Sequence, residues 1–283
     1  IVHHVAEEGR NILERASDIR REETVAAKGE KLSPALIGLV ASAGLHSAPV
    51  HKVPKVAVIA SGDEVVAPGK PLTEGKLYAS NMVEICSWLT FCGLAYSAVL
   101  VGDSRQEIQY AITTQLSDAD AFVTSGGAWG SERDLILDVV AKLDWQGIYH
   151  RVRMGPGKPV GFGLLEQKPF FVLPGGPPSN EMAFLELALP ALMKMKGDTD
   201  FSFPVVRAQL TETVCGHKDW TQFIHARLEK EKHQLIVKPA KLKSRLMSMA
   251  RKDALIVIPE GWEEWVAGEI LEIQLLNPDF NYR

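Results

Sequence analysis

The sequence has few cysteines, and none is placed to bind zinc or to build a disulfide framework. Cys86, Cys92 and Cys215 include no CxxC pair, and an odd number cannot form a complete set of internal disulfides. Cys86 and Cys92 lie in an apolar stretch, where buried free thiols are expected. A reducing, cytoplasmic location fits this usage best.

Long apolar runs and basic blocks are also absent. No apolar run reaches the roughly 20 residues that a membrane-spanning helix needs, and no signal peptide is visible. The formal net charge of −4, without a basic cluster, argues against nucleic acid or an anionic membrane as the main partner. Because the chain begins at Ile1 without a methionine, we expect a part upstream of it to be missing.

What remains is an ordinary globular composition with a clear central pattern. The 283 residues are 46% hydrophobic, which is enough to bury a core. Between residues 51 and 197, apolar strands alternate with amphipathic helices, which predicts a doubly wound, mostly parallel α/β sheet. The expected strands are 54–61, 95–102, 120–125, 147–154 and 169–174, and the expected helices are 80–91, 104–116, 132–143 and 177–195.

The two flanking regions have different patterns. Residues 1–50 are interpreted as the remnant of an N-terminal helical and β region, with strand and loop at 1–30 and a helix at 34–43. Ser33 is the expected N-cap of that helix and Gly44 its C-terminal stop. Residues 198–283 read as short alternating strands, at 203–214, 221–231, 234–240, 254–261 and 268–276, and predict a small β domain.

Four glycine-containing loops lie at or near the carboxyl ends of the predicted central strands. They cover 61–65, 125–134, 153–159 and 173–180. Ligands of such sheets bind beyond the carboxyl ends of the strands. Glycine lets a ligand approach the backbone, and helix N-termini favour phosphate. Four such loops together indicate a phosphorylated small ligand, to which Lys158 can add a cation.

The acids in these loops need a separate explanation. Asp63, Glu64, Glu132 and Asp134 would repel a phosphate unless a divalent cation lies between them, which predicts Mg²⁺. Each feature also has a purely structural interpretation. Glu132 and Asp134 can complement a helix dipole, a lone Ser-Gly-Gly is usually a tight turn, and Lys158 can be a solvated surface lysine.

The motifs occur in an order that resembles the molybdopterin molybdotransferases of the MoeA type, to which the gephyrin E domain is related. The motifs are ASGDEV, TSGG followed by an acid, any residue and Asp, PGKP, and LPG followed by Pro and Ser. The stretches GRNILERASDIRREETVAAKGEKLSPALIGLVASAG and SRLMSMARKDALIVIPEG extend the resemblance to nearly the whole chain. It implies a molybdopterin-binding fold, an elongated homodimer, and Mg²⁺-assisted insertion of molybdate into adenylylated molybdopterin with release of AMP.

The resemblance also assigns residues to the site. It implies that Asp134 and Glu132 are catalytic and bind Mg²⁺, and that Ser179 contacts an oxyanion. The residues expected to bind the pterin nucleotide are Asp63, Ser80, Asn81, Ser125, Gly126, Gly127, Pro156, Gly157, Lys158, Pro159, Pro174, Gly175, Pro177 and Ser179.

Three departures from the family pattern bear on activity. The aspartate before Ser80-Asn81 is Ala79, the lysine before the PGKP turn is Gly155, and the asparagine of LPGNP is Gly176. They favour, as an alternative, a non-catalytic molybdopterin carrier or scaffold. A second alternative is molybdopterin adenylyltransferase, because SERD at 131–134 echoes the Gly-Gly…Arg-Asp motif of a related single-domain family.

Overall fold

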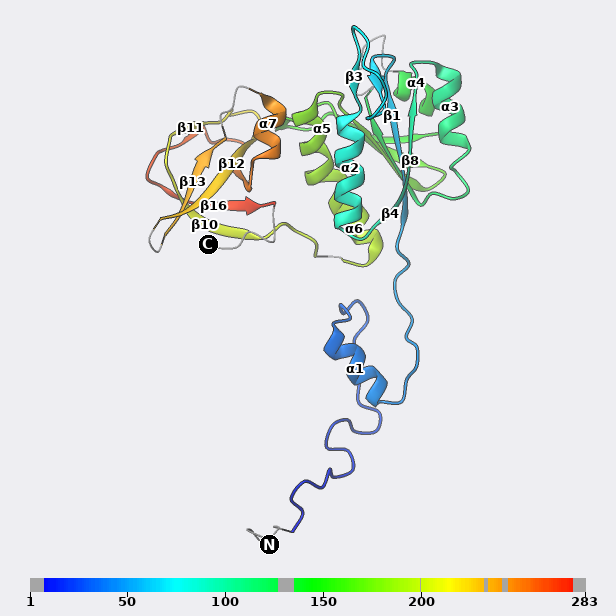
Figure 1. Cartoon of the computed structure of the whole chain (residues 1–283), viewed down its shortest axis with the longest axis vertical. Helices are drawn as coiled ribbons and strands as arrows, with labels where there is room; N and C mark the ends of the chain where they lie inside the picture. Colours follow the sequence, from blue (N-terminus) through cyan, green and yellow to red (C-terminus); the bar gives the residue numbers. More distant parts are fainter. Residues whose placement is uncertain (1–7, 127–134, 199, 232–233, 241–243, 277–283) are drawn as a thin grey trace.

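The structure is a computed structural model, and it describes residues 8–126, 135–198, 200–231, 234–240 and 244–276. Figure 1 shows an α/β region, a β domain beside it, and an N-terminal segment that lies apart from both. None of the helices in the described ranges is long and apolar enough to cross a membrane.

Within residues 8–50, the described part of the N-terminal segment, there is one regular element. Helix α1 spans Pro34–Ser42, and Ser33 Oγ accepts a hydrogen bond from Leu36 N–H at 3.1 Å, as predicted for an N-cap. Residues 8–33 contain turns and bends, so the strand predicted within 1–30 is absent from that described part. No residue of α1 is buried, because the helix packs against neither sheet (Figure 1).

The central sheet confirms the predicted doubly wound architecture. Its order is β4–β1–β5–β9–β8–β6; the first four strands pair in parallel, and β8 pairs antiparallel with both β9 and β6. These strands span Ala95–Val101, Lys55–Ser61, Ala121–Ser125, Lys168–Leu173, Gly161–Leu165 and Gln146–His150, respectively. The continuous apolar runs in β1 and β5 reflect burial on both faces of the sheet.

Helices cover both faces of this sheet. One face packs against α2 (Ser80–Phe91), α5 (Pro177–Ala183) and α6 (Leu189–Lys196). The other packs against α3 (Arg105–Thr113) and α4 (Leu135–Ala141). Alternate residues of β1 point to the two cores, with Val56 and Val58 on one side and Ala57 and Ile59 on the other.

Three predictions inside this region were wrong in detail. The single strand predicted at 147–154 is two strands, β6 and β7 (Met154–Gly155), because Arg151 adopts a left-handed conformation with φ 74° between them. Strand β8 was not predicted. The helix predicted at 177–195 is divided by a π-helical turn at Phe184–Ala188, just before Pro190, which has no N–H to continue the α-helical ladder.

Two side chains shape the start of α3. Ser104 Oγ accepts from Glu107 N–H at 3.4 Å, as an N-cap should. The Glu107 carboxylate accepts from Gly102 N–H at 2.9 Å. Glu107 therefore holds the loop that follows β4 and does not return to the cap residue as in a capping box.

The β domain contains all five predicted strands. They are β10 (Val205–Leu210), β12 (Thr221–Glu231), β13 (Gln234–Pro239), β14 (Ala254–Ile258) and β16 (Ile270–Leu275). The pairing order β13–β10–β16–β14–β12, with β12 also paired to β13, closes these strands into a ring. Helix α7 (Arg245–Ala250), and the short pair β11 (Val214–Cys215) and β15 (Glu264–Trp265), were not predicted.

The remaining short strands connect loops. β2 (Val65–Val66) pairs with β3 (Leu77–Tyr78) in the loop that follows β1. β7, which belongs to the α/β region by sequence, pairs in parallel with β12 of the β domain. Arg153 O accepts from Thr221 N–H at 3.1 Å at the start of this pairing, so the two regions share a backbone connection.

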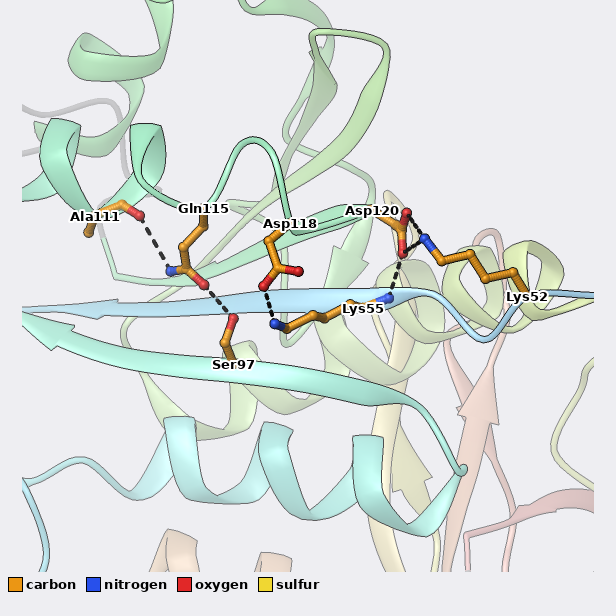
Figure 2. Close-up of polar contacts among 7 residues, drawn as sticks. All are labelled: Lys52, Lys55, Ser97, Ala111, Gln115, Asp118 and Asp120. Carbon is orange, nitrogen blue, oxygen red and sulfur yellow. Dashed lines mark hydrogen bonds and ion pairs between the residues drawn. The ribbon is translucent and has the colours of Figure 1, made fainter.

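Ion pairs fix the amino ends of the strands, opposite the ends at which ligands bind in such sheets. Lys52 Nζ lies 2.8 Å from Asp120 Oδ1, and Lys55 N–H donates to the other oxygen of Asp120 at 2.8 Å (Figure 2). Lys55 Nζ also contacts Asp118. These contacts tie the entry of β1 to the entry of β5 and leave the carboxyl ends of the strands to the loops.

Candidate functional site

The carboxyl ends of β1, β5 and β9 come together at one edge of the parallel sheet. Ser61, Ser125 and Leu173 are their last residues. Gly126 N–H donates to Leu173 O at 3.0 Å, which holds the loop after β5 against β9. Three of the four predicted loops begin near this edge, so the structure supports the expectation that they meet there.

Ser125 is the centre of a hydrogen-bonded group at this edge. Its side-chain oxygen lies 3.1 Å from Asn180 Nδ2 and 3.4 Å from Asn81 Nδ2. Asn180 also donates to Pro174 O at 2.8 Å, and Asn81 donates to Gly175 O at 2.8 Å. Two amide side chains from different helices therefore fix the Pro174–Gly175 loop against β5. We call these five residues, with Ser61, Gly62 and Gly126, the sheet-end surface.

Glycine is required where the backbones of this surface approach each other. Gly126 has φ 107°, and a Cβ there would lie 3.1 Å from Ser61 O. The nearest atom to a Cβ on Gly175 is the Gly126 Cα, at 3.9 Å. Glycine at these positions thus lets the loops pack backbone against backbone, and close approach of a ligand to them stays a prediction. Gly127, Glu132 and Asp134 lie outside the described residues.

Asp63 braces this edge through its backbone and side chain. Its Oδ1 accepts from Asp103 N–H at 3.0 Å, and its own N–H donates to Asp103 Oδ2 at 3.3 Å. Lys76 Nζ donates to Asp63 O. The loop after β1 is therefore locked to the loop after β4. Contact between Asp63 and the pterin nucleotide stays a prediction.

A second surface lies where the α/β region meets the β domain. A polar cavity of about 290 Å³ lies there, and its walls include Pro156, Pro178, Gln222, His225, Arg245 and Ser248. These residues come from the PGKP loop, α5, β12 and α7. We call this cavity the β-domain pocket. Because Arg245 supplies a permanent positive charge, the pocket suits an oxyanion.

The PGKP loop is held beside this pocket by the β7–β12 pairing. Met154 and Gly155 pair with Thr221 and Gln222. Gly157 has φ 112°, and a Cβ there would lie 2.9 Å from the side chain of Met154. The loop is therefore tightly seated, while the Lys158 side chain remains exposed with its Nζ 5.2 Å from the ring centre of Trp220.

A buried cluster of charges lies beside the pocket and joins the two regions. Glu181 on α5 contacts Lys252 Nζ through one oxygen, and its other oxygen is 3.2 Å from His225 Nε2. Glu181 is 2% exposed and the Lys252 side chain 7%, so both charges are shielded from water. Loss of either partner would leave the other charge buried without compensation.

The pKa values of two carboxyl groups in this cluster are shifted in opposite directions. Burial opposes ionisation of Glu181, but contact with His225 and the charge of Lys252 outweigh it and lower the pKa of Glu181. Burial raises the pKa of Glu84, on α2, to about 8, and hydrogen bonding to Glu181 adds to the rise. Glu84 is therefore protonated at neutral pH and donates to the ionised Glu181.

The remaining residues predicted to bind the pterin nucleotide differ in position and exposure. Ser80 is exposed at the start of α2, while Pro177 and Ser179 are half-buried in the first turn of α5. Ala79 is the N-cap residue of α2 and is 4% exposed, and no side chain caps the helix there. No group of three or more His, Cys, Asp or Glu side chains in the described ranges is arranged to hold a metal ion. Mg²⁺ binding by Glu132 and Asp134 stays a prediction.

Sequence reasoning missed several residues that the fold brings to the site. Asn180 follows the predicted Ser179, and its position in the first turn after Gly175-Gly176 was an available signal. Arg245 and Ser248 lie in the SRLMSMA stretch, which was noted only as part of the resemblance. His225 and Lys252 gave no local signal, because their partner Glu181 is 44 and 71 residues away.

Comparison with known families gives two matches that cover the two sheets. Residues 57–194 match a probable molybdopterin binding domain, and residues 207–276 match the C-terminal region (domain IV) of MoeA. The two matches are adjacent in the chain, and the sheet-end surface and most of the β-domain pocket fall within them.

Curated relatives and a solved structure extend the similarity along the chain. Molybdopterin molybdenumtransferase 2 of Mycobacterium tuberculosis (strain ATCC 25618 / H37Rv) is 30% identical over 278 residues, covering 96% of this chain and 69% of the relative. Molybdopterin molybdenumtransferase of Haemophilus influenzae is 32% identical over 196 residues, covering 69% of this chain and 48% of the relative. The crystal structure of the molybdopterin biosynthesis MoeA protein from Pyrococcus horikoshii superposes with a TM-score of 0.78 at 29% identity, covering 92% of this chain and 64% of that one. The chain thus spans about two thirds of the length of the Mycobacterium tuberculosis relative and of the Pyrococcus horikoshii structure.

Proposed function

The chain belongs to the MoeA-type molybdopterin molybdenumtransferase family, and we propose that it inserts molybdate into adenylylated molybdopterin with release of AMP. Molybdopterin and molybdate are the substrates in this proposal. The two dithiolene thiols bind molybdenum as their protons leave with one molybdate oxygen as water, and one water molecule hydrolyses the phosphoanhydride bond that links the pterin phosphate to AMP.

One observation carries the proposal: two consecutive residues of α5 belong to two surfaces of complementary chemistry. Asn180 belongs to the sheet-end surface, and Glu181 to the charged cluster beside the β-domain pocket. The first surface offers glycine backbone to a phosphate-bearing nucleotide, in loops that the side chains of Asn81 and Asn180 hold in place. The second offers Arg245 to an oxyanion, with Lys158 on the adjacent loop.

Each surface has its own task in this mechanism. The sheet-end surface binds and orients the pterin nucleotide by hydrogen bonds that carry no net charge. The cations beside the β-domain pocket bind molybdate and balance its two negative charges as it approaches the nucleotide. Mg²⁺, if held by Glu132 and Asp134, would neutralise phosphate charge when AMP leaves.

The test is release of AMP by the purified chain. With adenylylated molybdopterin, Mg²⁺ and molybdate we expect AMP to appear, and we expect little AMP when molybdate is omitted. Arg245→Ala should reduce the molybdate-dependent rate by at least tenfold, while Lys238→Ala, in an exposed pair with Glu229, should leave it unchanged. Equal AMP release with and without molybdate would contradict the proposal.

A non-catalytic binder is the second candidate, because the N-cap residue of α2 is Ala79. The family pattern has an aspartate there, and no side-chain hydrogen bond caps this helix. Calorimetry would then detect binding of the adenylylated pterin without AMP release. The third candidate, molybdopterin adenylyltransferase, predicts ATP-dependent release of pyrophosphate, which the same samples can be assayed for.

We further propose that the chain acts as a homodimer. No residue of α1 is buried, and its apolar side chains Ile37 and Leu39 are 53% and 38% exposed. A second copy is an occupant that would bury them. Light scattering should give twice the chain mass of 31.1 kDa, and Ile37→Glu should reduce it to the single-chain mass. A single-chain mass for the unchanged protein would contradict this.

We also propose a cytoplasmic location. Its support is chemical: Cys86, Cys92 and Cys215 are all free thiols. Cys215 is exposed and would be open to oxidation outside a reducing compartment. Cell fractionation should recover the full-length protein with the soluble fraction, and recovery with membranes or outside the cell would contradict the proposal.

A further inference from the structure

Gly155 leaves a space that an aromatic ring fills. The family pattern has a lysine before the PGKP turn, and a lysine needs a Cβ. In this structure a Cβ on Gly155 would lie 2.7 Å from Trp220 Nε1 and 3.1 Å from Gln222 Oε1. Real Cβ contacts are longer than 3.0 Å, so position 155 cannot carry a side chain while Trp220 keeps its place.

Trp220 is held in that place from several directions. Its ring stacks on His217, with centroids 3.5 Å apart and an interplanar angle of 7°. Its Nε1–H donates to Gln222 Oε1 at 3.2 Å. Trp220 also directly precedes β12, whose first residue is bonded to Arg153 O. An indole held in this way cannot swing aside cheaply to admit a side chain at 155.

The same ring lies under the one lysine that the PGKP loop retains. Lys158 Nζ is 5.2 Å from the ring centre, within the range at which an ammonium is attracted to an aromatic face. No ion pair between described residues involves Lys158. The ring therefore restricts the ammonium without neutralising it, and its charge stays available to an anion.

These contacts lie beside the β-domain pocket. Pro156, from the PGKP loop, forms part of the pocket wall. Gln222, which accepts the indole N–H, forms another part of it. The Lys158–Trp220 pair is thus connected to the pocket on both sides, through the loop and through β12.

We propose that Trp220 is a positioning residue for molybdate binding. It takes the space of the second lysine in the family pattern and holds the Lys158 ammonium at the edge of the β-domain pocket. This rests on the proposed function, because the anion is taken to be molybdate. One lysine held in place then binds the anion where the family pattern has two, because the Lys158 side chain loses less conformational freedom when the anion binds.

The proposal predicts that the effect of a substitution at position 155 depends on the residue at position 220. Gly155→Lys alone should force the indole out of its place and lower Tm by roughly 5 °C, as overpacking does. Combined with Trp220→Ala, the same lysine should fit. The double variant should then melt within about 2 °C of Trp220→Ala alone.

Steady-state kinetics tests the positioning role. Trp220→Ala should raise KM for molybdate about two- to fivefold, the range expected for a partly exposed ammonium–ring contact, with kcat changed less than twofold. Trp220→Phe keeps an aromatic face and should recover most of the loss. Gly155→Lys with Trp220→Ala should return KM to within about twofold of the unchanged protein. Trp262→Ala is the matched control, because that ring packs on Trp265 and is 52% exposed.

The outcomes separate this inference from the proposed function. A KM for Trp220→Ala equal to that of Trp262→Ala, or a loss of kcat with KM unchanged, would overturn the positioning role. If the unchanged protein releases no AMP, calorimetric titration with sodium molybdate alone makes the same comparison. Weaker binding by Trp220→Ala than by Trp262→Ala would then support the inference although the proposed function had failed, and equal binding would overturn it.

Discussion

The sheet-end surface and the β-domain pocket are built from opposite kinds of chemistry. At the sheet end, Ser125, Asn81 and Asn180 are uncharged and bond mostly to one another and to backbone. Around the pocket, Glu181, Lys252 and Arg245 are charged, and two of them are almost fully buried. The side chains of the sheet-end surface hold its backbone in place, whereas each buried charge beside the β-domain pocket needs an oppositely charged partner.

This difference indicates how each surface tolerates change. Loss of one side-chain amide removes two neutral hydrogen bonds, each contributing about 1 kcal/mol. A buried charge left alone costs about 3–5 kcal/mol. The pocket should therefore be the more fragile part of the site, although the sheet-end surface lies nearer the main core.

The largest expected effect is at the buried charge. Glu181→Ala leaves Lys252 and His225 without their partner, so we expect the free energy of unfolding to fall by about 3–5 kcal/mol. Urea unfolding followed by circular dichroism measures this. Lys238→Ala removes an ion pair on the exposed surface of β13 and is the control, with little change expected. Equal changes in the two variants would remove the contrast between buried and exposed charge.

Gly126→Ala tests the sheet-end surface with a smaller expected effect. The φ of 107° and the 3.1 Å approach to Ser61 O make a methyl group costly, so we expect a loss of about 1–3 kcal/mol and a lower rate of AMP release. Gly176→Ala is the matched control, because a Cβ there meets no atom within 4 Å and its φ is −71°. If both alanines had the same effect in thermal melts, close backbone approach would not be the reason for glycine at 126.

Glu84→Gln addresses the pH dependence of the charged cluster. Because folding raises the pKa of Glu84 to about 8, its contribution is fully present below about pH 4.5 and is lost as pH rises through 8. Glutamine imitates the protonated form. Because Glu84 is partly exposed and water screens much of the shift, we expect Tm to rise at pH 8.5 by about 2–4 °C, or roughly 1 kcal/mol. At pH 5 the two proteins should melt together. A constant difference in Tm across this range would contradict the assignment.

Ala79→Asp should have the smallest effect on stability and can have the most informative effect on activity. An aspartate at the N-cap of α2 can accept a backbone N–H, but the cap ψ of 56° is not ideal, so we expect a gain of about 0.5 kcal/mol. Ala79→Asn supplies a similar cap without the charge. AMP release that increases with aspartate alone would assign the carboxylate to chemistry. An increase with both would assign it to the helix start.

Much of the fold could be predicted because its signals are local. The runs at 55–61 and 121–125 are buried on both faces, and β16 alternates between buried and more exposed positions, so burial there follows from the sequence period. Strand β8, GFGLL, was missed because its glycines weaken that period. The break before β7 depends on the backbone of Arg151, which no composition rule predicts.

The site was less predictable because its contacts are distant in sequence. The glycine loops could be found from their own residues, and Ser125, Gly126 and Gly175 do meet at one edge. The pocket could not be found in this way, since Glu181 reaches Lys252 across 71 positions and Gly155 meets Trp220 across 65. The departure at Gly155 was visible in the sequence, whereas its compensation by Trp220 required the fold.

The pairing of β7 with β12 has a consequence for protein engineering. Two residues that precede the PGKP turn complete the hydrogen-bonding edge of a sheet whose other strands all come after residue 204. Exchange of the β domain between relatives at the apparent junction near 198 would separate β12 from the strand it was selected to pair with. Functional chimeras should therefore inherit residues 153–158 and 217–222 from the same parent.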